Sequence, residues 1–68
     1  MNPLDPDTFP PRIGAPATGA VAAAGITSYD QLATWTERDL LALHGVGPKA
    51  VRILSEALDQ RGSSFAPD

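Results

Sequence analysis

Residues 44–50 read HGVGPKA, in which two glycines are separated by one valine and followed by a proline and a lysine. Glycines this close together indicate a sharp turn or a close approach of the backbone to a neighbour, because glycine adopts backbone angles that other residues avoid. Leu40, Leu41 and Leu43 precede this stretch, and apolar residues at helical spacing follow it from Ala50 to Leu58. The stretch therefore predicts two helices joined by a glycine turn.

Three enzyme or nucleotide motifs share letters with this stretch, but its context fits none of them. Gly45, Gly47 and Ala50 match the dinucleotide fingerprint GxGxxG/A, which needs a preceding strand, whereas a helix is expected here. HGVG resembles the oxyanion-hole glycines of esterases, but the chain has no GxSxG nucleophile elbow. The P-loop pattern GxxxxGK[ST] does not occur either. We therefore expect no enzyme and no cofactor.

The composition predicts one small helical domain. The chain has 68 residues, of which 43% are hydrophobic and only 6% aromatic, and alanine supplies much of the apolar content. The absence of cysteine excludes disulfides and thiolate metal sites, and a single histidine argues against a zinc site. No apolar run is long enough to cross a bilayer, and the N-terminus lacks a secretory pattern. We expect a cytoplasmic protein with no membrane partner.

The charge distribution permits nucleic-acid binding without favouring it. A formal net charge of −3 counts against a strong binder of nucleic acid. However, all 5 basic side chains lie within residues 12–62, whereas Asp5, Asp7 and Asp68 lie outside this range. The central part of the chain is therefore close to neutral.

Four helices and no strand are expected, which makes the chain all-α. Proline-rich residues 1–11 are expected to form a flexible leader, followed by a domain over residues 12–66. Tyr29 and Trp35 are expected to pack in the core or at a helix joint. The predicted helices run from Pro16 to Gly25, from a Thr27 or Ser28 cap to Thr34, from a Thr36 cap to about Leu43, and from Pro48 to Gly62.

The segment LHGVGPKA resembles the helix-hairpin-helix motif, whose pattern is hydrophobic–Gly–hydrophobic–Gly–x–x–Ala. The order of GITSYDQL, WTERDLL and LHGVGPKAVRILSEAL is similar to that in the C-terminal domain of the bacterial RNA polymerase alpha subunit. Small stand-alone bacterial helix-hairpin-helix proteins share the IGxPAT opening at residues 13–18. The resemblance implies a compact four- to five-helix tandem domain of the SAM-like class. Residues 13–25 would form a degenerate first unit, with Gly14 in the place of Gly45, and residues 44–50 the intact hairpin.

The resemblance also implies a function, which is weak and largely sequence-independent binding of double-stranded DNA through its phosphate backbone, or alternatively binding in its minor groove. The first unit departs from the family because Pro16 and Gly19 stand where an arginine and an asparagine are typical. The alternative is a helical module that binds a protein partner, in which the glycines serve only the turn. The implied contacts are Gly45, Val46, Gly47, Lys49 and Arg52, with Arg12 and His44 as further candidates.

Overall fold

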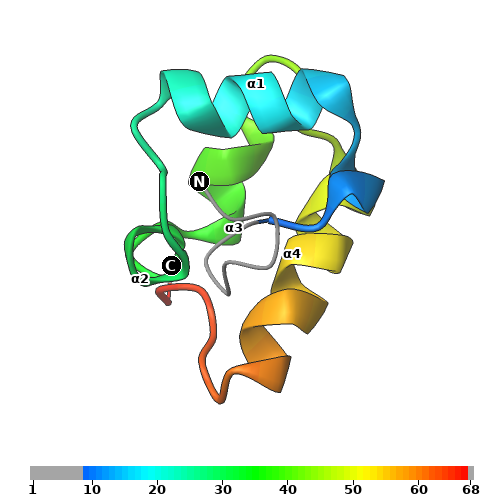
Figure 1. The fold of residues 1–68 in the computed structure, drawn as a ribbon. Helices are drawn as coiled ribbons and strands as arrows, with labels where there is room; N and C mark the ends of the chain where they lie inside the picture. The colour runs from blue at the N-terminus through cyan, green and yellow to red at the C-terminus, as the bar shows by residue number, and fades with distance from the viewer. Residues whose placement is uncertain (1–8, 68) are drawn as a thin grey trace.

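The computed structural model describes residues 9–67, and every regular element within this part of the chain is helical (Figure 1). The all-α prediction is therefore confirmed. No helix among residues 9–67 has the length and apolar character that a membrane span requires. In chain order the elements are the 3₁₀ helix η1 (Pro11–Ile13), α1 (Ala15–Ala23), α2 (Tyr29–Leu32), α3 (Glu37–Leu41) and α4 (Pro48–Gln60).

The ends of α1 and α4 follow the predicted glycine signals. Gly25 after α1 and Gly62 after α4 adopt positive φ angles of 83° and 73°. In both cases the N–H of the next residue donates to a carbonyl of the last helical turn at 2.9 Å, as in a Schellman motif. Glycine fits these two positions because a Cβ atom makes the left-handed conformation costly.

The short helices α2 and α3 begin at the predicted hydroxyl caps. The Ser28 hydroxyl accepts a hydrogen bond from the Gln31 N–H at 3.2 Å, and the Thr36 hydroxyl accepts one from the Asp39 N–H at 3.0 Å. The Gln31 side chain reaches back as in a capping box, but it accepts from the N–H of Thr27 at 2.6 Å. These caps satisfy N–H groups that have no partner within such short helices.

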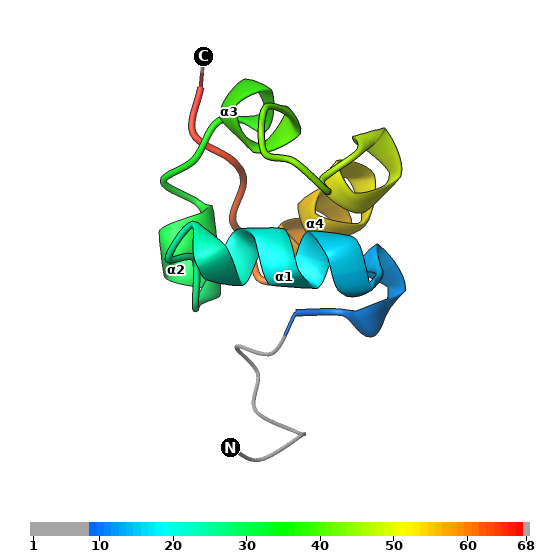
Figure 2. The ribbon, with the colours of Figure 1, turned by 90° about the horizontal axis from the view of Figure 1, so that it is seen from above.

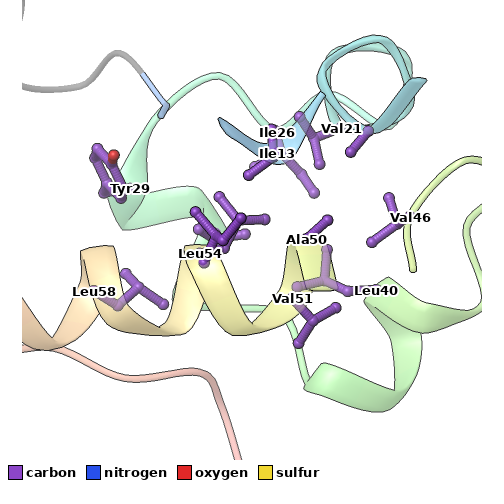
Figure 3. Packing of buried hydrophobic residues seen from close by; sticks show 13 residues of the cluster. Ile13, Val21, Ile26, Tyr29, Leu40, Val46, Ala50, Val51, Leu54 and Leu58 are labelled. Atoms are coloured by element: carbon purple, nitrogen blue, oxygen red, sulfur yellow. The ribbon is translucent and has the colours of Figure 1, made fainter. Parts of the chain in front are cut away.

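One apolar core joins all the elements (Figure 3). α4 supplies the largest share, with one face of alanine, valine, isoleucine and leucine directed into it. No polar or charged side chain among the described residues is buried. The buried residues are Ile13, Ala17, Val21, Ile26, Tyr29, Leu32, Leu40, Val46, Ala50, Val51, Ile53, Leu54 and Leu58.

The folded part extends further towards the N-terminus than residue 12. The Phe9 ring packs edge-on against Tyr29, with ring centroids 5.0 Å apart and an interplanar angle of 87°. The Arg61 guanidinium lies over the same tyrosine, 4.4 Å from its centroid. Phe9 thus packs against the core, and η1 begins two residues later at Pro11. The rest of the predicted leader, residues 1–8, lies outside the described residues.

The C-terminal segment returns from α4 towards the joint between α2 and α3 (Figure 2). The Ala66 N–H donates to the carbonyl of Trp35 at 2.9 Å, and Phe65 packs against the core. Trp35 is itself partly buried against the core, as predicted for a residue at a helix joint. The two ends of the domain are thus held by contacts with α2 and with the loop that follows it.

Candidate nucleic-acid interface

The turn between α3 and α4, residues 42–47, is the predicted glycine turn. The Leu43 N–H donates to the Leu40 carbonyl at 3.0 Å, and the Val46 N–H donates to the Leu43 carbonyl at 3.2 Å. The Val46 side chain is 6% exposed and lies in the core between the helices. The Val46 side chain therefore packs between the two helices, and its N–H, a candidate contact for nucleic acid, already has a partner within the turn.

Gly45 is required by packing within the protein. Its φ angle is 98°, and a Cβ atom at this position would lie 2.9 Å from the carbonyl oxygen of Pro16. The residue is exposed on the remaining side. The close approach that the glycine pair indicates is therefore the approach of the turn to the first turn of α1.

Gly47 has a different environment, although it lies only two residues further along. It is the N-cap of α4, with an extended backbone (φ −108°, ψ 177°), and a Cβ atom there would meet no heavy atom within 4 Å. Neither backbone strain nor packing requires glycine at this position. Because glycine has no side chain, the N-cap residue accepts no side-chain hydrogen bond from the first N–H groups of α4.

The N-termini of α1 and α4 contrast with those of α2 and α3. Hydroxyl side chains cap α2 and α3, whereas no side chain in residues 9–67 caps α1 or α4, which begin after Gly14 and Gly47. The first N–H groups of a helix have no intrahelical partner and carry the positive end of its dipole. The 13-residue helix α4 therefore offers uncapped donors beside Lys49, which lies in its first turn.

Three basic side chains meet on one side of α4. Lys49, Arg52 and Glu56 lie on one exposed face of α4, and Arg12 reaches the same face from η1. Together with Ile53 they line an open hollow of about 410 Å³, which we call the cationic hollow. The Arg12 guanidinium lies 3.9 Å from the Glu56 carboxylate. The structure thus brings three of the predicted site residues together.

His44 lies apart from this group. It lines a separate hollow with Leu43 and three alanines of α1 and its C-terminal end, on the α1 side of the glycine turn. It is exposed and is not among the residues that line the cationic hollow. The structure therefore does not bring His44 together with Arg12.

The start of α1 matches the start of α4 in its apolar framework. Ile13, Gly14 and Ala17 hold the same relative places as Val46, Gly47 and Ala50, with a buried residue, an N-cap glycine and a buried alanine. The sequence prediction placed Gly14 opposite Gly45. Their φ angles of 91° and 98° agree with that pairing, but its place at the helix start makes Gly14 the counterpart of Gly47.

Sequence reasoning missed Glu56 as a residue of this surface. It stands one helical turn beyond Arg52 on the same face of α4, and this spacing was a usable signal. The sequence alone could not predict the contact of Glu56 with Arg12, because this contact depends on how η1 packs against α4. Comparisons with protein-family models, with curated proteins and with solved structures found no match to this chain.

Proposed function

We propose that this chain is a tandem helix-hairpin-helix domain of the SAM-like class that binds the phosphate backbone of double-stranded DNA weakly and with little sequence preference. The observation that carries the proposal is the uncapped N-terminus of α4 beside the cationic hollow. Donors with no helical partner, a helix dipole and mobile cations at one place suit a phosphate group.

Each residue has a distinct part in this proposal. The N–H groups of Gly47 and Lys49 at the start of α4 donate to a phosphate oxygen, whereas Pro48 between them has no N–H. Lys49 adds a point charge, and Arg52 adds a planar fork of donors one turn further along. Gly45 and Val46 act indirectly, by fixing the turn against α1 and the core. Such contacts read no base, so they supply affinity without sequence preference.

The expected affinity is low because few phosphates are neutralised. Two or three contacts give a slope of log K against log salt of about −2 to −3, which is roughly a twentyfold loss between 50 and 200 mM salt. Non-specific binding of this kind starts from dissociation constants of about 10⁻⁴–10⁻⁶ M. We therefore expect stable binding to need a dimer, a tethering partner or several copies on one duplex.

A protein-binding module is the second candidate, and one observation favours it. Leu41 is 45% exposed, and it lines a hollow between α3 and α4 together with Pro48 and Val51. An exposed leucine beside a groove is a common feature of helix-binding surfaces. In this alternative Lys49 and Arg52 are solvated surface charges.

Retention of the full chain on immobilised duplex DNA at low salt distinguishes the two candidates. Lys49→Glu should abolish retention, because it places a carboxylate at the α4 N-terminus. Arg38→Glu on α3 is the matched control, with the same change in charge at an exposed position outside the hollow. Equal loss of retention in the two variants, or unchanged retention of Lys49→Glu, would contradict the proposal. The helical signal in circular dichroism should stay the same in both variants.

A further inference from the structure

Arg12 and Glu56 form an exposed ion pair inside the cationic hollow. Their side chains are 72% and 59% exposed, and the two groups lie 3.9 Å apart. An ion pair this exposed and this long contributes little to stability, because solvent screens it. Its position is more informative than its strength, since Glu56 is the one acidic residue lining a hollow with three basic residues.

Glu56 and a bound phosphate would compete for the guanidinium of Arg12. η1 packs against α4, so Arg12 lies on the face that carries Lys49 and Arg52, but Glu56 on that same face already attracts its guanidinium. A phosphate in the hollow would meet three cations and one carboxylate. The carboxylate opposes it twice, by direct repulsion and by holding Arg12. Removal of that single charge should therefore affect phosphate binding more than removal of a carboxylate elsewhere.

We infer that the cationic hollow is a second phosphate site on the DNA-binding surface, and that Glu56 limits its affinity by holding Arg12. This inference rests on the proposed function and extends it from the helix N-terminus to the flank of α4. The ligand is a phosphodiester of the duplex backbone next to the one held at the N-terminus. Arg12 and Glu56 are the residues that decide whether this second contact forms.

Glu56→Gln tests the inference in the full chain, with binding to a short duplex measured over a range of salt concentrations. We expect about fivefold tighter binding at low salt, and a salt slope steeper by about 0.9, the value for one more neutralised phosphate. Asp30→Asn is the matched control, because it removes one exposed carboxylate on α2 without touching the hollow. The control should leave the salt slope unchanged.

A double variant separates the role of Arg12 from a general charge effect. In Arg12→Gln/Glu56→Gln most of the gain over Arg12→Gln should be lost, because only the relief of direct repulsion remains. An equal gain for Glu56→Gln and Asp30→Asn, or a gain of the same size without Arg12, would overturn the inference while leaving the proposed function in place. If no variant binds duplex at low salt, the proposed function falls with it. Inorganic phosphate alone should compete only weakly, and competition as strong as that of duplex would contradict a backbone site.

Discussion

The starts of α1 and α4 share a framework but differ in chemistry. Each helix follows a buried aliphatic residue and an N-cap glycine, and each has a buried alanine in its first turn. The outward positions differ, because Pro16 and Gly19 on α1 take the places of Lys49 and Arg52 on α4. The residues that build such a helix start are therefore separable from those that could bind an anion. α1 keeps the first set and lacks the second.

The two glycines of the turn should respond very differently to alanine, and this is the largest effect we expect. Gly45→Ala combines a positive φ with a Cβ atom 2.9 Å from the Pro16 carbonyl oxygen, so we expect a loss of about 2–4 kcal/mol in the free energy of unfolding. Gly47→Ala has an extended backbone and open space, and should cost about 1 kcal/mol or less. Urea unfolding followed by circular dichroism measures both. A similar loss of unfolding free energy in the two variants would show that the close approach of α1 to Gly45 does not exclude a side chain there.

The two glycines that follow the ends of α1 and α4 should respond alike to alanine, unlike Gly45 and Gly47. Gly25→Ala and Gly62→Ala each force a left-handed conformation on alanine without a steric clash, because a Cβ atom at either site meets nothing within 4 Å. We expect each to lower the free energy of unfolding by about 1–2 kcal/mol. The same urea titration compares them. A much larger loss for one variant would indicate that only one of the two Schellman motifs supports the fold.

The smallest expected effect comes from giving α1 the chemistry of α4. Gly19 is exposed within α1 and has open space around it, so Gly19→Arg should be accommodated and should stabilise the helix by about 0.5–1 kcal/mol. If the two helix starts face the same duplex, this arginine should also tighten DNA binding severalfold. Gly19→Gln is the control, because it gains helix propensity without charge. Equal DNA binding by the two variants would place the start of α1 away from the duplex.

Local signals in the sequence predicted the four helices, the caps of α2 and α3 and the stops of α1 and α4, because caps and stop signals act within one turn. The predicted ends of α2 at Thr34 and of α3 at about Leu43 lie two residues beyond the observed ones. Ser28, Thr36, Gly25 and Gly62 all hold the places expected of them. What the sequence did not predict depends on contacts between distant segments. The close approach of Pro16 to Gly45 is one example, and the edge-on packing of Phe9 against Tyr29 is another.

The candidate site shows the same division. Lys49 and Arg52 were predicted because local sequence signals identify their helix and the residue at which it begins. The sequence also suggested Arg12, but not the hollow that brings it to α4 or the carboxylate of Glu56 beside it. Val46 was assigned to the site from its motif position, whereas packing of its side chain and the bond to Leu43 remove it from the surface. In this chain, motif spacing predicted the backbone framework of the site better than it predicted which charged side chains line it.

The central claim is that the start of α4 binds the DNA backbone, whereas the start of α1 lacks the side chains to do so. A titration of the isotopically labelled full chain with a short duplex at low salt, followed through its amide signals, tests this most directly. We predict shifts at Gly45, Gly47, Lys49 and Arg52 that diminish as salt is added, with much smaller shifts at Gly14 and Gly19. Unchanged signals at Gly47 and Lys49, or equal shifts at the two helix starts, would contradict the claim.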